Sequence, residues 1–208
     1  GDDFRKINWK ATARKNSLIV NTYSPEKNQH IYIFIDSSRV MNSEINNIKK
    51  LDYAINSAFL LSDYIIKGGD NVGLMVFDHK VRKYLKPGKG PAQFDLIADN
   101  LYNVEAPESS ASYDESIVFF NSKQKRRALI FIFTELFNKD EAIRFAAAVR
   151  GNLSKHLVFT ITIKDPRIEE LAKSKASSTR EMFIKSAAVK TLHERKKIKA
   201  VLTSAGIL

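Results

Sequence analysis

The residues best placed to do chemistry are Asp36 and Ser38, which follow a short apolar run over residues 31–35. Such a run predicts a buried strand that delivers a carboxylate and a hydroxyl at its carboxyl end. In open α/β sheets, ligands bind in the crevice beyond the carboxyl ends of the strands. Mg²⁺ prefers oxygen ligands, including one or two carboxylates. The pair is therefore a candidate site for Mg²⁺ or Mn²⁺.

Two later segments could add oxygen donors to this site. Glu135 follows a second apolar run over residues 128–133 and could supply a second acid. Ser112 or Asp114 could come from the segment between the two strands. The carboxyl ends of parallel strands meet at one edge of a sheet, so these side chains are expected to lie near one another.

The spacing of Asp36 and Ser38 also fits a simpler role, the capping of a helix. A third oxygen would be expected two residues after Ser38, but position 40 is valine. Asp36 and Ser38 could instead only cap a following helix, by accepting hydrogen bonds from its free backbone N–H groups. Both interpretations fit the sequence.

Alternating strands and helices must position these residues. Strands are predicted over residues 18–20, 31–35, 72–77, 81–85, 128–133 and 156–163. Helices are predicted over residues 48–67, 94–101, 114–120, 138–151, from 165, and 178–203, the last three beginning at the capping residues Asn138, Asp165 and Ser178. The strands are continuous apolar runs, as in sheets covered on both faces, and the turn at residues 78–80 predicts a hairpin. The fold class is therefore α/β, a three-layer sandwich with a mostly parallel sheet and one antiparallel hairpin.

Composition excludes several classes of site. The chain of 208 residues has no cysteine, which excludes disulfides, zinc–thiolate sites and thiol nucleophiles. No apolar run reaches the ~18–20 residues that a membrane helix needs. The four histidines are scattered, and Lys197 stands where a zinc-protease motif beginning at His193 would need its second histidine. No nucleophile and base are paired, so we expect no enzyme.

The net charge of +11 is concentrated near the carboxyl terminus. Residues 164–208 hold 11 Lys and Arg against 5 Asp and Glu. A basic surface attracts nucleic acid, anionic lipid or an acidic protein, although a solvated helix face has the same composition. The aromatic residues are predicted in the core rather than beside these bases, so we expect no nucleic-acid partner.

The first fourteen residues identify a family. This segment, GDDFRKINWKATAR, resembles the hallmark segment of domain-of-unknown-function family fifty-eight, a bacterial group with a von Willebrand factor A-like domain. The resemblance continues through residues 33–36, 73–77 and 127–135 and covers nearly the whole chain. It implies a von Willebrand A-type, Rossmann-like fold.

The resemblance also implies a metal-ion-dependent adhesion site (MIDAS). Such sites use the pattern Asp-x-Ser-x-Ser, a Thr from a later loop and an Asp at a strand end. Asp36 and Ser38 match the first two positions, whereas Val40 departs from the third. Tyr113 stands where the Thr is expected and Glu135 where the Asp is expected. A degenerate site is therefore expected, with Asp36, Ser38 and Glu135 as the metal ligands.

Family members often lie beside MoxR-type AAA+ ATPases and are thought to act as their partners or adaptors. Many carry membrane helices upstream of the hallmark segment. We therefore expect a non-enzymatic interaction module, cytoplasmic or the soluble part of a membrane-anchored protein. A metal-dependent hydrolase and a nucleic-acid binder that uses the basic last helix are the alternatives.

One domain is expected over residues 1–208 and comprises a docked arm with an edge strand (1–30) and an α/β core (31–208). The abrupt polar start, and an apolar pair at residues 207–208 that resembles the beginning of a strand, indicate a piece of a longer protein.

Overall fold

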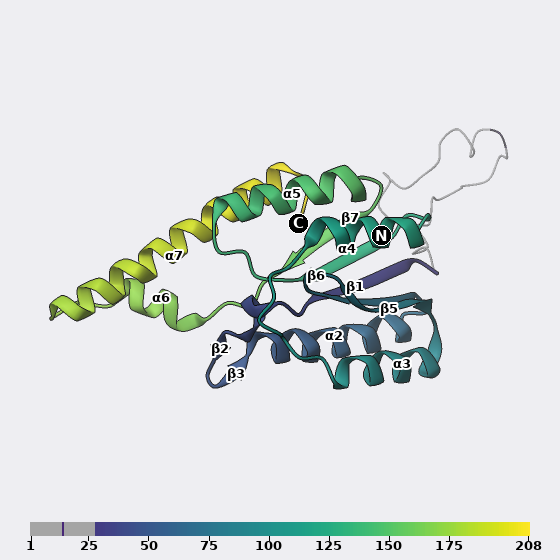
Figure 1. Cartoon of the computed structure of the whole chain (residues 1–208), viewed down its shortest axis with the longest axis horizontal. Helices are drawn as coiled ribbons and strands as arrows, with labels where there is room; N and C mark the ends of the chain where they lie inside the picture. Colours follow the sequence, from purple (N-terminus) through teal and green to yellow (C-terminus); the bar gives the residue numbers. More distant parts are fainter. Residues whose placement is uncertain (1–13, 15–27) are drawn as a thin grey trace.

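A five-stranded sheet forms the centre of the structure, a computed structural model that describes residue 14 and residues 28–208. The strand order is β5-β4-β1-β6-β7 (Figure 1). The strands are β1 (His30–Asp36), β4 (Asn71–Phe77), β5 (Val81–Gly88), β6 (Leu129–Phe133) and β7 (Leu157–Ile161). All neighbours pair in parallel except β4 and β5, which form the predicted antiparallel hairpin.

Helices cover both faces of the sheet, which confirms the predicted three layers (Figure 1). One face carries α2 (Lys50–Lys67) and α3 (Gly90–Tyr102). The other carries α4 (Tyr113–Lys123), α5 (Lys139–Leu153) and the second half of α7 (Thr179–Ser204). A short helix, α6 (Pro166–Lys173), lies beside the first half of α7, and the two extend away from the sheet (Figure 1).

Strand β1 contributes to both halves of the core. Ile31, Ile33 and Ile35 face α2 and α3, whereas Tyr32 and Phe34 face the opposite helices. This division follows from the two-residue period of a strand. Both aromatic rings meet Phe120 of α4 edge to face, with centroid distances of 4.7 and 4.8 Å, a geometry that favours aromatic pairs.

The segment between β1 and α2 differs from the prediction. A helix was expected from residue 48, but residues 39–49 form a 3₁₀ helix, η2 (Arg39–Asn42), and a hairpin of β2 (Glu44–Ile45) and β3 (Ile48–Lys49). Asn46 and Asn47 both have positive φ, 53° and 62°. Two consecutive left-handed residues make the turn that matches strand twist in a two-residue hairpin, and asparagine tolerates that conformation. The Asn-Asn pair was the signal in the sequence.

Helix starts agree with the predicted capping residues. Asn138 Oδ1 accepts a hydrogen bond from Glu141 N (2.9 Å), and Glu141 Oε2 accepts one from Phe137 N (2.8 Å), which completes a capping box. Asp165 Oδ1 caps α6 by accepting from Arg167 N (2.9 Å). Ser178 Oγ caps α7 in the same way. Side-chain oxygens thus satisfy backbone donors that a helix start leaves free.

The apolar residues after α7 extend the sheet. Leu208 N donates to Val158 O (3.1 Å), and Thr160 N donates to Leu208 O (2.7 Å). These two bonds have the parallel pattern, so the chain runs along the edge of β7, as the strand-like composition predicted.

The predicted strand at residues 18–20 and most of the expected arm (1–30) lie outside the described residues. Within the part that is described, no helix is long and apolar enough to cross a membrane.

A glycine in β4 allows the sheet to close around a buried tyrosine, and its substitution tests this packing. A Cβ at Gly73 would lie 2.6 Å from Tyr32 Cε1 and 2.9 Å from Leu85 O. Tyr32 cannot easily retreat, because its hydroxyl bonds to Tyr84 and Gln124. We expect Gly73→Ala to lower the free energy of unfolding by about 1–3 kcal/mol, the usual cost of overpacking.

Chemical denaturation measures this change. The matched control is Gly151→Ala in α5, where a Cβ would meet no atom within 4 Å. That variant should gain up to about 1 kcal/mol, because alanine is the better helix former. Equal stabilities of the two variants would contradict this account of Gly73.

Candidate functional site

A buried chain of hydrogen bonds links the carboxyl ends of β1 and β6. Thr134 Oγ1 donates to Asp36 Oδ2 (2.6 Å). Tyr113 Oη lies 2.8 Å from Thr134 Oγ1 and 3.4 Å from Asp36 Oδ2. Because the single hydroxyl proton of Thr134 is given to Asp36, Tyr113 is the donor to Thr134 and shares its one proton with Asp36 in the longer contact. The expected position of Tyr113 at this site agrees with the geometry, whereas the hydroxyl of Thr134 was missed.

The Asp36 carboxyl is completely buried. Burial raises its pKa, and hydrogen bonds from Ser38, Thr134 and Tyr113 oppose that rise only in part. Burial, with the nearby negative charge of Asp36, also raises the pKa of Tyr113. The site thus holds an acid whose charge is stabilised by hydroxyl and amide donors rather than by a direct ion pair.

Ser38 is buried, and its hydroxyl makes no hydrogen bond of good geometry among the described residues, although it lies close enough to the Asp36 carboxyl to lower the pKa of that acid. Only its backbone N–H is engaged, donating to Asp36 Oδ1 (2.8 Å). Ser38 precedes the 3₁₀ helix η2, but its side chain makes no capping bond there. The capping role considered for Ser38 is therefore wrong. A buried hydroxyl without a partner is costly, so it calls for a ligand or solvent.

Glu135 is paired with a lysine that sequence reasoning missed. Lys50 Nζ lies 2.8 Å from Glu135 Oε2, and the side chains are only 8% and 6% exposed. Lys50 is the first residue of α2, four residues before the buried Ala54 and eight before the buried Ala58. This spacing places Lys50 on the buried face of the helix. A charged residue in phase with an apolar stripe was the available signal.

These groups lie beneath an open crevice of about 350 Å³ at the carboxyl edge of the sheet. Its lining includes Ser38, Tyr113 and Glu135, together with the exposed Arg39 and Arg144. The two other expected donors, Ser112 and Asp114, also line the crevice. Neither forms a hydrogen bond to Asp36 in the described residues. The residues predicted for the site thus lie at this edge of the sheet, and the site itself remains a prediction.

A second buried acid fixes one wall of the crevice. Asp78, just after β4, accepts two hydrogen bonds from Arg82 (2.9 and 2.5 Å) and one from Ser109 Oγ (2.8 Å). Ser109 O in turn accepts from Arg39 N (2.9 Å). Burial acts to raise the pKa of Asp78, but the bonds from Arg82, Lys80 and Ser109 hold it well below its usual range. Asp78 was assigned only to a turn, so this role was missed.

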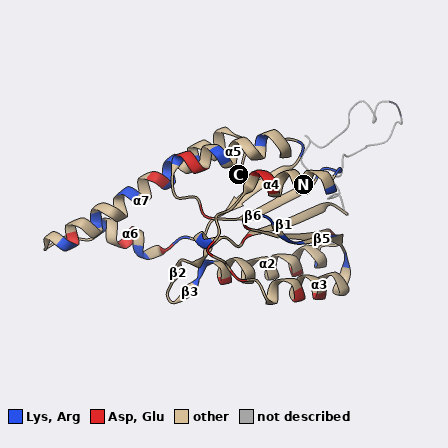
Figure 2. Ribbon diagram, in the orientation of Figure 1, with Lys and Arg blue, Asp and Glu red and all other residues tan. Residues whose placement is uncertain are grey.

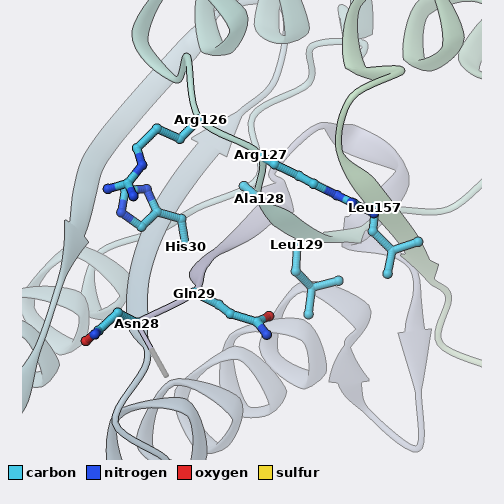
Figure 3. A pocket seen from close by; sticks show the side chains of 8 residues that line it. All are labelled: Asn28, Gln29, His30, Arg126, Arg127, Ala128, Leu129 and Leu157. Atoms are coloured by element: carbon cyan, nitrogen blue, oxygen red, sulfur yellow. The ribbon is translucent and has the colours of Figure 1, made fainter. Parts of the chain in front are cut away.

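A larger hollow, about 690 Å³, lies at the opposite edge of the sheet (Figure 3). His30, Arg126 and Arg127 line it, together with the apolar starts of β6 and β7. The two arginines are exposed, and His30 Nδ1 is bonded to Gln124. This hollow lacks buried, convergent polar groups, and residues 15–27, which precede it in the chain, are not described. The smaller crevice is therefore the better candidate site.

The basic residues near the carboxyl terminus do not form a single stripe. In Figure 2, Lys and Arg are distributed along α6 and α7 among acidic residues. Lys197 pairs with Glu194 (2.8 Å), and Asp165 pairs with Arg167 (3.0 Å). The described part of this surface is basic on average, with acidic residues among the bases, and it includes the exposed Phe183 near Arg180 and Lys185.

The donors at the crevice fit a metal ion only in part. Asp36 and Ser38 offer oxygens, but Val40 offers none and Glu135 is already paired with Lys50. Among the described residues, no three His, Cys, Asp or Glu side chains gather closely enough to hold a metal ion. The ligand set Asp36, Ser38 and Glu135 remains a prediction.

No histidine hydrogen-bonds to Asp36, Ser38 or Glu135 in the described part of the chain. His156 is instead structural: its Nδ1 accepts from Ala128 N (3.1 Å), at the start of the sheet. Burial, and to a smaller extent the charge of Lys155, lowers the pKa of His156 to about 4. It therefore stays neutral at physiological pH.

Comparisons with known proteins identify related sequences. The family model described as "Protein of unknown function DUF58" matches residues 1–194. Uncharacterised proteins of Mycobacterium tuberculosis and Mycobacterium bovis are 19% identical over 173 residues, which is 82% of this chain and 54% of theirs. The chain thus spans about half the length of these curated relatives.

Three similar solved structures have low sequence identity to this chain. The PilB minor pilin from Streptococcus sanguinis has a TM-score of 0.52 and 8% identity, over 88% of this chain and 64% of that one. The conserved hypothetical protein BatB from Bacteroides thetaiotaomicron has a TM-score of 0.46 and 16% identity, over 64% and 65%. The SpRpn10 VWA domain has a TM-score of 0.43 and 14% identity, over 77% and 82%.

The free energy of unfolding should depend on pH through the ionisation of Asp78, which fixes one wall of the crevice. Because the folded-state pKa of Asp78 is lowered, its carboxylate stabilises the fold above the unfolded-state pKa of about 4. That contribution disappears as the pH falls below this value toward the folded-state pKa. We expect Asp78→Asn to lower the free energy of unfolding by about 1–3 kcal/mol at pH 7, as for other charged hydrogen bonds.

Urea unfolding of both proteins between pH 3 and 8 measures the difference. The gap between wild type and variant should be constant above about pH 5 and should narrow below about pH 4. The matched control is Asp99→Asn, at an exposed position of α3, which should show no such gap. A gap that widens on acidification would disprove the assignment.

Proposed function

Because the chain belongs to the DUF58 family and has a von Willebrand A-like fold, we propose that it is a non-enzymatic protein-interaction module that binds its partner at the carboxyl-edge crevice. The observation that carries the proposal is the hydroxyl of Ser38, which is buried, lines the crevice and has no partner among the described residues. A group from a partner protein would satisfy it.

Two exposed arginines at the crevice offer contacts to an acidic group on the partner, and the acids Asp114, Glu135 and Glu141 line the same crevice. Arg39 and Arg144 are exposed at its lining, and the first turn of α4 presents backbone N–H groups there. Ser112, which precedes α4, makes no side-chain cap. Arginines and free N–H groups at a helix start bind carboxylates well. A partner Asp or Glu, inserted between Ser38 and these donors, is the proposed contact.

We propose that this crevice is a degenerate MIDAS. Asp36 and Ser38, with Glu135, are the residues that would hold Mg²⁺ or Mn²⁺, and such an ion would offer a coordination position to a partner carboxylate. The donors present are fewer than the family pattern, so recognition is proposed to depend mainly on the Ser38 hydroxyl, the backbone N–H groups and the two arginines.

The proposed partner is a MoxR-type AAA+ ATPase, and this assignment rests on the family resemblance. A cytoplasmic module, alone or as the soluble part of a membrane-anchored protein, would suit that partner. A hydrolase at the same crevice would need a base beside the reacting water. The absence of a histidine bonded to the crevice acids in the described residues supports the non-enzymatic role.

The choice of variant for the test follows from the hydrogen bonds. Asp36→Ala would leave Thr134 and the Ser38 N–H without their acceptor inside the protein, so it would disturb the fold. Ser38→Ala removes only an unpartnered hydroxyl. We therefore expect Ser38→Ala to leave the free energy of unfolding unchanged or slightly raised, while it weakens partner binding.

Binding to the purified MoxR-type ATPase of the same organism, measured by titration calorimetry, tests the proposal. Loss of one hydrogen bond to a charged group costs about 1.5–3 kcal/mol, so Ser38→Ala should weaken binding at least about tenfold. The double variant Arg39→Gln/Arg144→Gln should also weaken it and reduce its dependence on salt.

The matched control is Ser122→Ala at an exposed position near the far end of α4, which should bind as wild type does. Unchanged binding by the Ser38 and arginine variants would exclude the crevice as the site. Hydrolysis of a generic phosphoester that depends on Asp36 would replace the proposal with an enzymatic function.

A further inference from the structure

A buried ion pair of Lys50 and Glu135 lies beside the crevice. Lysine is almost never buried without a charged partner, and Lys50 is the only buried lysine or arginine among the described residues. Its Nζ donates to Glu135 Oε2 at 2.8 Å. The ammonium reaches this carboxylate from the start of α2, across 85 residues of sequence. The pair therefore joins α2 to the loop that follows β6.

Glu135 lies where the family pattern has the acid of the metal site. It follows Thr134, whose hydroxyl bonds to Asp36, and it lines the same crevice as Ser38. In a metal-binding relative this carboxylate would help to balance the charge of the cation. In this chain an ammonium already balances it, at hydrogen-bond distance and away from solvent.

The positive charge of Lys50 also lowers the pKa of a second acid, Asp165. Asp165, which caps α6, has a pKa below its usual range, first through its hydrogen bonds with Arg167 and in smaller part through the charge of Lys50. The Lys50 ammonium thus interacts with Glu135, which follows β6, and with Asp165, which precedes α6. A divalent ion at the same edge would face that ammonium as a repulsive neighbour.

We propose that the Lys50 ammonium is a built-in replacement for the divalent cation, so that the crevice binds its partner without metal. This inference deepens the proposed function, because it concerns the same crevice, and it rests on that function for the partner alone. Lys50 is a positioning residue: it fixes Glu135 and supplies the positive charge that a MIDAS obtains from an ion.

The alternative is that the pair only packs α2 against the sheet. Buried ion pairs are weak evidence for stability, because desolvation cancels much of their attraction. A purely structural pair would leave the metal affinity of the crevice unaffected when the ammonium is removed. A replacement for the cation would expose Glu135, together with Asp36 and Ser38, to a metal ion.

Mn²⁺ titration followed by electron paramagnetic resonance separates these roles. We expect Lys50→Met to bind Mn²⁺ at least about tenfold more tightly than wild type, since the variant keeps the side-chain volume but loses the competing charge. The double variant Lys50→Met/Glu135→Gln should lose that gain. The matched control is Lys67→Met, which removes an exposed ammonium paired with Asp63 on the same helix and should bind as wild type does.

The folding of each variant is checked by circular dichroism before titration. If Lys50→Met fails to fold, Lys50→Gln replaces it, because glutamine can still donate to Glu135 without a charge. A folded charge-removing variant that binds Mn²⁺ no more tightly than wild type does would overturn the inference.

A separate measurement distinguishes this inference from the proposed function. Wild-type binding to the MoxR-type ATPase should be the same in EDTA and in excess Mg²⁺. Binding that EDTA abolishes would overturn the metal-free role of Lys50 while leaving the interaction module intact. If the ATPase does not bind at all, that proposed partner fails, and the Mn²⁺ titrations still decide the role of Lys50.

Discussion

The burial of strand β1 from Ile31 to Asp36 is the constraint on which the rest of the structure depends. Its neighbours β4 and β6 pair with it in parallel on both sides, and helices cover both of its faces. A parallel strand in this position has no access to solvent, so its side chains must be apolar until the strand ends. Asp36 is the first residue at which the chain can change to polar chemistry. The position of the crevice therefore follows from the packing of the sheet.

Two buried acids at this edge are stabilised in opposite ways. Asp78 is held by the guanidinium of Arg82, so its charged form is favoured and it fixes the loop around Ser109. Asp36 is held only by hydroxyl and amide donors, and burial disfavours its charge. The first acid is suited to a structural role. The second lies beneath the crevice that is proposed to bind a partner.

The sequence predicted the strands, the hairpin and most helices, because apolar runs and capping residues are local signals. Asn138, Asp165 and Ser178 each cap the helix expected from them. The β2–β3 hairpin was missed because two residues per strand give too short a pattern to detect by periodicity. Thr134 and Lys50 were missed for another reason: their roles depend on residues 98 and 85 positions away.

The sequence by itself determined the fold class and the family, and it predicted a site at the carboxyl edge of the sheet. These features depend on composition and order along the chain, and the hallmark segment together with Asp36 and Ser38 carried them. Only the tertiary structure decided which charges meet. Glu135 was expected beside a metal ion, but α2 brings the Lys50 ammonium to it. A charged pair in a low-dielectric interior is defined by distance and desolvation, and neither can be obtained from the spacing of residues in a sequence.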